Sequence, residues 1–213
     1  MEERIEIISI SPPRDKKIVV QVLIKSSNGS QKAEFAFAEK IWKTLSLSMG
    51  IINQEALADI EFYSEVSRAY FSAYASFAYS PSSLKALKQK LYQKGFSKNV
   101  CNEAIAIVEK DGYVKEGDIA VRRAQIFISK LWGRLRIIAK LKEEGFSDGA
   151  IREAEDFISN VEFEKNCSIA IKKQFGEIPA DTRDREKMYA YLSRQGYVSA
   201  DIHKAVRLLM KEK

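Results

Sequence analysis

Apolar residues recur three or four positions apart through most of the chain after residue 53, which is the spacing of one helix face. Helices are predicted over Glu65–Tyr79, Asp118–Leu131 and Phe163–Phe175, and two more follow each of these. The pattern therefore predicts nine helices in three groups of three. The last helix of each group carries its apolar positions at Val100, Ala104, Ile107 and Val108; at Ile151, Ala154, Phe157 and Ile158; and at Ile202, Ala205, Val206 and Leu209.

The pattern Leu-x-x-x-Gly-aromatic occurs once in each group. Its glycines are 50 and 51 residues apart. A Gly in this position takes the left-handed conformation that ends a helix. A period near 50 indicates a repeat protein, which usually presents a long surface to another macromolecule. The three copies are Leu91–Phe96, Leu141–Phe146 and Leu192–Tyr197, followed by the candidate N-caps Ser97, Ser147 or Asp148, and Ser199; Ser80 and Asp181 are candidate N-caps for the helices that precede the glycines.

The first 50 residues have a different pattern. Arg4–Ile10 alternates between two faces, Ile18–Ile24 is rich in β-branched residues, and Ala33–Phe37 can form a third strand. Between the last two, Asn28-Gly29 is a strong hairpin signal. A helix is expected over Glu39–Ser48. The segment is therefore predicted to be a small antiparallel sheet with a short helix.

The predicted fold class is mainly α, with three tandem three-helix repeats in an elongated curved array behind this small β segment. The expected domain boundaries are 1–52 for the β segment and its helix, then 53–112, 113–161 and 162–213 for the three repeats.

Composition limits the function classes. Hydrophobic residues make up 46% of the chain, enough for a folded core, and no run approaches the length of a membrane span. The start of the chain lacks the pattern of a signal peptide, so we expect a cytoplasmic protein with Cys101 and Cys167 reduced. His203 is the single histidine, which leaves little material for catalytic triads or metal sites. We expect no enzyme activity, no metal and no cofactor.

Positive charge is concentrated in the middle of the chain. Residues 85–142 contain 14 Lys and Arg against five Asp and Glu, a net charge of +9. Such a field attracts polyanions and acidic surfaces, although each side chain can also serve only to solvate an exposed helix face. The candidate residues for contacts with a partner or DNA are Lys88, Lys94, Arg122, Arg123, Lys130, Arg134, Arg136, Lys140 and Lys142.

Two smaller features have competing interpretations. The aromatic stripe of Tyr70, Phe71, Tyr74, Phe77 and Tyr79 can form a base-stacking platform, but at helical spacing we favour the hydrophobic core. Asp111, Glu116 and Asp118 can be drawn as a metal cluster, but Asp111-Gly112 is better explained as turn chemistry.

The repeated Gly-aromatic turns, the segment Leu131–Ile138 leading to Leu141, and the closing Lys187–Leu192 together resemble the RecX family. The N-terminal strands and Ser80-Pro81 are similar to the longer members of Gram-positive type. The chain departs from many members at Lys115-Glu116, where they have paired acids, and in its longer N-terminal hairpin.

The resemblance implies a regulator of the RecA recombinase, active in homologous recombination, DNA repair and the SOS response. Such proteins bind the groove of the RecA–single-stranded DNA filament. They limit filament growth, and with it ATP hydrolysis, strand exchange and coprotease activity. We expect a monomer that contacts RecA and single-stranded DNA but no membrane. The alternative is a helical repeat protein that binds nucleic acid directly.

Overall fold

The computed structural model describes residues 4–27 and 29–211, which form two compact units. The first unit is built from Met1–Pro81 and Leu87–Val114, and the second from Ser82–Ala86 and Lys115–Lys213. The finer division predicted at residues 53, 113 and 162 stays a prediction.

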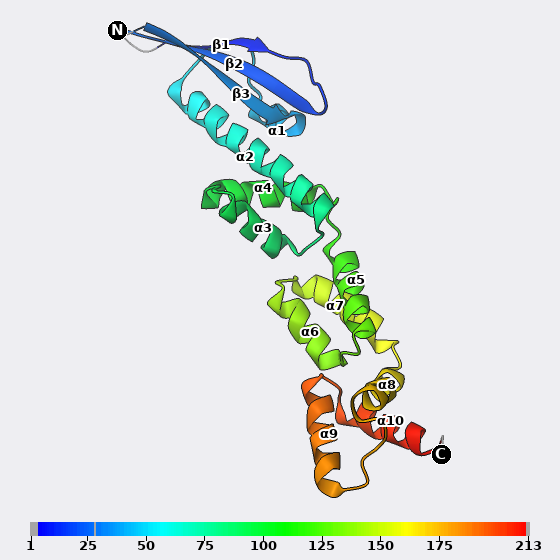
Figure 1. The fold of residues 1–213 in the computed structure, drawn as a ribbon. Helices are drawn as coiled ribbons and strands as arrows, with labels where there is room; N and C mark the ends of the chain where they lie inside the picture. Colours follow the sequence, from blue (N-terminus) through cyan, green and yellow to red (C-terminus); the bar gives the residue numbers. More distant parts are fainter. Residues whose placement is uncertain (1–3, 28, 212–213) are drawn as a thin grey trace. The chain divides into compact units, whose positions relative to one another are not determined.

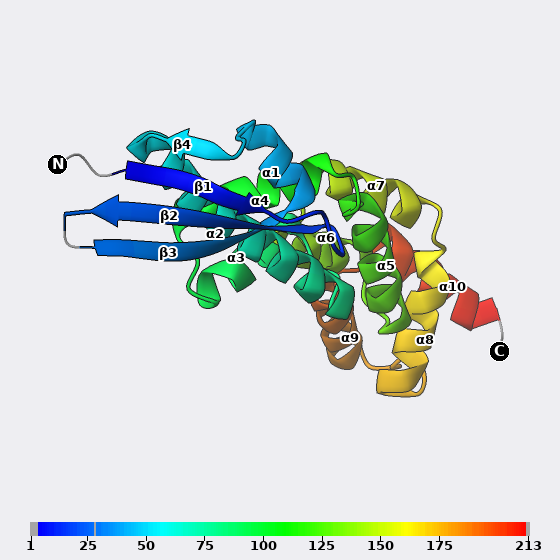
Figure 2. The ribbon, with the colours of Figure 1, turned by 90° about the horizontal axis from the view of Figure 1, so that it is seen from above.

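The first unit begins with a four-stranded antiparallel sheet in the order β3-β2-β1-β4 (Figure 2). The predicted alternation in β1 is confirmed for Ile5 and Ile7, which are buried, but a register shift between Ile7 and Ser9 interrupts it, and Ile10 packs against the same cluster. The Asn28 half of the predicted turn lies outside the described residues. The elements are β1 (Arg4–Ile10), β2 (Lys17–Ser26), β3 (Gly29–Ala38), the helix α1 (Glu39–Leu45) and β4 (Gly50–Ile52).

One face of this sheet packs against helices. Phe37 of β3 lies beside Trp42 of α1, with ring centroids 5.0 Å apart, and Leu57 and Ile60 of the next helix complete the cluster. Burial of this apolar face stabilises a sheet that would be marginal alone. The sequence did not predict β4, whose three residues pair with β1.

Nine helices follow in the part of the chain that the structure describes, and the mainly helical fold class is confirmed (Figure 1). The first is longer than predicted, because it starts at Gln54 with Asn53 as its N-cap. The helices are α2 (Gln54–Tyr79), α3 (Leu84–Gln93), α4 (Lys98–Lys110), α5 (Glu116–Ser129), α6 (Arg134–Glu143), α7 (Asp148–Ser159), α8 (Phe163–Phe175), α9 (Thr182–Arg194) and α10 (Ser199–Lys211).

The three Gly-aromatic turns share one geometry. Gly95, Gly145 and Gly196 have φ values of 89°, 79° and 89°. In each turn the N–H of the following aromatic residue donates to the carbonyl oxygen of the repeated Leu, at 3.1–3.3 Å. This pattern satisfies carbonyl groups that a helix end leaves free. The predicted helix ends at these glycines are therefore confirmed.

The predicted N-caps are only partly correct. Ser97, Ser147 and Asp181 each accept a hydrogen bond from a backbone N–H of the helix that they begin. Ser199 does not act as a cap, because α10 begins at Ser199 itself. The prediction of Ser80 as the N-cap of α3 is also wrong, because Ser83, nearer the helix, accepts a hydrogen bond from the Ala86 N–H at 3.1 Å.

Candidate functional site

The nine predicted basic residues fall into two groups. Lys88 on α3 and Lys94 just after it belong to the first unit. The other seven belong to the second unit, where α5 carries Arg122 and Arg123, Lys130 follows α5, and α6 carries Arg134, Arg136, Lys140 and Lys142.

Two arginines of α6 are held by the last helix pair of the second unit. Arg134 donates two hydrogen bonds of 3.1 Å to the carboxylate of Asp201, which is 4% exposed. The Arg134 guanidinium also lies 4.9 Å from the centre of the Phe163 ring. Arg136 donates to the side-chain oxygen of Gln195 and lies 3.8 Å from the centre of the Trp132 ring. Both guanidinium groups therefore make contacts inside the protein.

Arg123 and Lys140 also have acidic partners. The Arg123 guanidinium donates to both oxygens of Glu144, at 2.9 and 2.5 Å, and this pairing raises the pKa of Arg123. Lys140 forms an ion pair with Glu143, three positions along the same helix. The first pair links α5 to the end of α6, whereas an exposed pair within one helix contributes little to stability.

The remaining members have charged ends directed to solvent or to neutral groups. Arg122 and Lys142 are exposed, and neither belongs to an ion pair within residues 4–27 and 29–211. Lys130 and Lys88 lie 6.0 Å from the rings of Phe127 and Tyr92. Lys94 donates to the hydroxyl oxygens of Ser72 and Ser76 on α2.

The Gly196 turn is seated on the start of α6. Gly133 and Leu135 donate backbone hydrogen bonds to the carbonyl oxygens of Gln195 and Gly196, at 2.8 and 3.0 Å. A Cβ at Gly196 would lie 2.4 Å from the backbone nitrogen of Arg136, and a Cβ at Gly133 would lie 2.2 Å from the Gly196 carbonyl carbon. Both positions therefore need glycine for close approach, and Gly196 also needs it for its left-handed conformation.

The Gly145 turn makes a related contact with the start of α3, within the second unit. Ser83 donates its hydroxyl hydrogen to the carbonyl oxygen of Glu144 at 2.6 Å, and Gly145 lies against the side chain of Lys85. Glu116 accepts from the backbone N–H of Leu84. The third turn differs, because no atom lies within 4 Å of the position that a Cβ would take at Gly95.

The aromatic stripe on α2 does not form the hydrophobic core, and that preferred interpretation is wrong. Tyr70, Phe71, Tyr74 and Phe77 are only partly buried, and Tyr79 is 93% exposed. The buried face of this helix is instead formed by Leu57, Ile60 and Val66 and by the smaller Ser67, Ala69 and Ala73. Small residues there let α2 approach α4 closely, and the large rings are displaced to the edge of the contact.

Asp111 links these rings to α1. It ends α4, and Gly112 follows with a φ of 64°, as turn chemistry predicts. Its carboxylate accepts from Lys40 and from the hydroxyl groups of Tyr70 and Tyr74, the latter two at 2.9 and 2.8 Å. Burial alone would raise the pKa of Asp111, but the hydrogen bonds from Lys40 and the tyrosines lower it below its usual value.

A cavity of about 470 Å³ opens beside this network in the first unit. Its charged lining is three lysines and one glutamate, and its rings are those of Tyr70, Phe71 and Tyr74. The lysines are Lys16, Lys40 and Lys43. The sequence showed the aromatic stripe but gave no signal that lysines from the β1–β2 turn and α1 would lie beside it.

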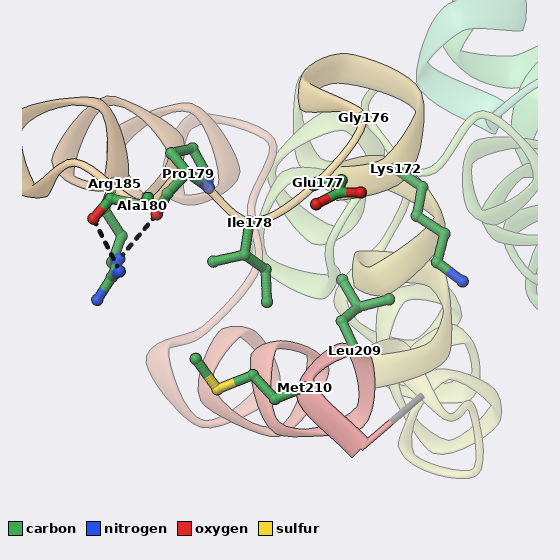
Figure 3. Close-up of a pocket in the computed structure, with 9 residues that line it drawn as sticks. All are labelled: Lys172, Gly176, Glu177, Ile178, Pro179, Ala180, Arg185, Leu209 and Met210. Atoms are coloured by element: carbon green, nitrogen blue, oxygen red, sulfur yellow. Dashed lines mark hydrogen bonds between the residues drawn. The ribbon is translucent and has the colours of Figure 1, made fainter. Parts of the chain in front are cut away.

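A second cavity, of about 360 Å³, lies between the α8–α9 loop and α10 in the second unit. Figure 3 shows Ile178, Leu209 and Met210 directed into it. Arg185 donates to the backbone carbonyl oxygens of Pro179 and Ala180, which fixes the loop. The charged side chains of Lys172, Glu177 and Arg185 also line the cavity.

The chemically reactive groups are dispersed or buried. In the described part of the chain no three His, Cys, Asp or Glu residues come together as metal ligands. Cys101 and Cys167 are buried free thiols, and burial raises the pKa of Cys167 to about 12. His203 packs against Tyr189.

No helix among the described residues is long and apolar enough to cross a membrane.

Comparison with known proteins gives a consistent result. No protein-family model matches the chain. A curated regulatory protein RecX from Chlorobaculum tepidum is 27% identical over 128 residues, which cover 59% of this chain and 78% of that protein.

Two solved structures share the fold. A crystal structure of a regulatory protein RecX has a TM-score of 0.72 at 16% identity and covers 98% of this chain and all of its own. The crystal structure of RecX from Lactobacillus salivarius has a TM-score of 0.58 at 15% identity and covers 69% of this chain and 97% of its own. The chain is therefore similar in sequence to a RecX regulatory protein and shares the fold of two RecX crystal structures.

Proposed function

We propose that this chain is a regulator of the RecA recombinase that acts without chemistry of its own. The relation to RecX regulatory proteins in sequence and fold carries the proposal. The chain would act as a cytoplasmic monomer on the RecA–single-stranded DNA filament. Bound in the filament groove, it would limit filament growth and so reduce ATP hydrolysis, strand exchange and coprotease activity.

The partner contacts in this proposal come from the basic residues that are exposed or only weakly held by neighbouring side chains. Arg123, Arg134 and Arg136 are engaged by side chains of their own unit. We therefore assign the contacts to the exposed or weakly held members of the predicted set, and give the three arginines a supporting role. These members are Lys88, Lys94, Arg122, Lys130, Lys140 and Lys142.

The test is ATP hydrolysis by RecA on single-stranded DNA, titrated with this chain at fixed salt and DNA. One arm uses filaments still assembling and the other uses preformed filaments. We expect inhibition in the assembling arm at well below one molecule per RecA protomer, because one blocked filament end stops every later addition. No effect in either arm, with RecA of the same organism, would overturn the proposal.

The second candidate is direct binding to nucleic acid, favoured by the net charge of +9 over residues 85–142. A protein that competes for DNA must occupy the lattice in proportion to RecA. Inhibition that is relieved merely by adding single-stranded DNA would therefore identify this second candidate.

A further inference from the structure

Five aromatic rings form a continuous line in the first unit. The ring centroids are 5.5 Å apart for Phe71 and Tyr70, 4.7 Å for Tyr70 and Tyr74, 5.0 Å for Tyr74 and Tyr113, and 6.0 Å for Tyr113 and Phe77. None of these rings is fully buried, and Tyr113, the fourth in the line, is 59% exposed. The line therefore presents aromatic surface to solvent. Rings that served only to pack the hydrophobic core would not need this exposure.

Lysines gather at the Phe71 end of this line. Lys17 lies 4.9 Å from the centre of the Phe71 ring, and Lys40 lies 4.5 Å from the centre of the Tyr70 ring. Lys16 and Lys43 line the adjoining cavity of about 470 Å³. We call the cavity and the line of rings together the lysine–aromatic groove.

The acidic groups near the groove neutralise only part of this charge. Glu39 pairs with Lys43, and Asp111 pairs with Lys40. Lys16 and Lys17 belong to no ion pair among the described residues. The backbone of Lys16 is fixed, because its carbonyl oxygen accepts from the Glu39 N–H at 2.9 Å. Two lysines without an ion-pair partner among the described residues therefore lie at a defined place beside partly exposed rings.

This combination matches the chemistry of one ligand class. Proteins bind single-stranded nucleic acid by placing cations along the phosphates and aromatic rings under the bases. An acidic protein surface would use the lysines, but its carboxylates would not stack on the electron-rich faces of the rings. Duplex DNA would present its phosphates but keep its base faces stacked inside.

We propose that the lysine–aromatic groove binds a short segment of single-stranded nucleic acid. Lys16 and Lys17 contact its phosphates, and Phe71 and Tyr113 offer faces for its bases. This site lies outside residues 85–142 except for Tyr113, and regulation of RecA does not require it. It adds a nucleic-acid contact that the proposed function leaves out.

The charge test uses fluorescein-labelled oligothymidylate and oligouridylate of 20 nucleotides, measured by anisotropy between 50 and 200 mM salt. Lys16→Gln/Lys17→Gln is compared with Lys25→Gln/Lys32→Gln, which removes the same charge from the exposed far part of the hairpin. We expect the first pair alone to weaken binding of the tighter oligonucleotide. For this variant the slope of log binding constant against log salt concentration should become shallower by about 1.4, or about 0.7 for each lost phosphate contact. Equal effects of the two pairs would overturn the proposal.

The stacking test compares Tyr113→Leu and Phe71→Leu with Tyr79→Leu, an exposed tyrosine that belongs to none of the ring contacts between described residues. We expect about a tenfold loss for each of the first two and no loss for the third. An abasic strand with the same number of phosphates loses both stacked bases, so it should bind about a hundredfold more weakly and should not respond to Tyr113→Leu.

Two results would reject nucleic acid as the ligand. Equal binding of the abasic strand would leave an electrostatic surface without stacking. Competition by polyglutamate as strong as that by oligothymidylate would indicate an acidic protein partner. Circular dichroism and thermal unfolding of each variant separate lost binding from lost folding. RecA is absent from every arm, so a negative result would not affect the proposed regulation of RecA.

Discussion

At the scale of single residues, two glycines with the same backbone conformation form a matched pair. Gly95 and Gly196 both have a φ of 89°, but only Gly196 has atoms within 4 Å of a Cβ position. Gly95→Ala should cost about 1 kcal/mol, the strain of a left-handed residue. Gly196→Ala adds a contact of 2.4 Å to the Arg136 backbone and should cost at least about 2 kcal/mol more. Urea unfolding measures both, and equal losses would contradict the crowding at Gly196.

Asp111 gives a residue-scale prediction that depends on pH. Its pKa is lowered in the folded state from the ordinary 3.8, so its contribution is present above 3.8 and is lost as pH falls through the lower folded value. Asp111→Asn should cost about 1–2 kcal/mol at pH 7. The difference in free energy of unfolding between this variant and the natural protein should be smaller at pH 3. Asp118→Asn, at an exposed position, is the control, and a difference independent of pH would rule out the charged form of Asp111 as the cause.

Residue-level prediction succeeded where the cause is local. The three repeated glycines could be placed at helix ends because their left-handed conformation is a property of one residue and its neighbours. The cap of α3 could not be chosen among Ser80, Ser82 and Ser83 by the same argument. Ser83 also contacts the carbonyl oxygen of Glu144, which lies 61 positions away in the sequence.

At the scale of elements, the pairing of α6 with α10 rests on Arg134. Its partner Asp201 is 4% exposed, so Arg134→Ala would leave a buried carboxylate without a countercharge. We expect a loss of about 2–3 kcal/mol in urea unfolding, below the full value for a buried pair because Arg134 itself is 34% exposed. Arg122→Ala, at an exposed position on the neighbouring helix, should cost less than about 0.5 kcal/mol. Similar losses for the two variants would contradict a supporting role for Arg134.

Element type followed from periodicity, but element length did not. The apolar spacing placed Phe163–Phe175 with its observed ends, because Gly176 follows as a stop. It missed the first 11 residues of α2, Gln54–Ser64, whose apolar positions pack in the cluster formed by the sheet and α1. The strand β4 has three residues, too few to show any alternation.

At the scale of the whole molecule, the sequence showed a basic middle segment but not which charges are available. Arg134 and Arg122 look alike in a charge pattern, and only the fold shows that Asp201 neutralises the first. The lysine–aromatic groove was missed for the opposite reason. Its lysines lie in the β1–β2 turn and in α1, within a part of the sequence that carries no net positive charge.

The last prediction tests whether basic residues on or next to α5 and α6, without an ion-pair partner in the described part of the chain, matter more for binding than the net charge of the protein. The triple variant Arg122→Gln/Lys130→Gln/Lys142→Gln removes three charges of the second unit that belong to no ion pair among the described residues. If these residues contact phosphates of the filament, its salt slope for binding RecA-coated single-stranded DNA should fall by about 2. The amount needed to inhibit RecA should rise several-fold, with thermal unfolding unchanged.

The control removes the same charge elsewhere in the second unit, at exposed positions on α7 and α10: Arg152→Gln/Lys204→Gln/Arg207→Gln. A general electrostatic attraction would weaken equally in both triple variants, because it depends on net charge and not on position. A local contact surface would respond only to the first. Equal weakening would therefore exclude α5 and α6 as the specific contact surface, while leaving the regulation itself to the ATP hydrolysis assay.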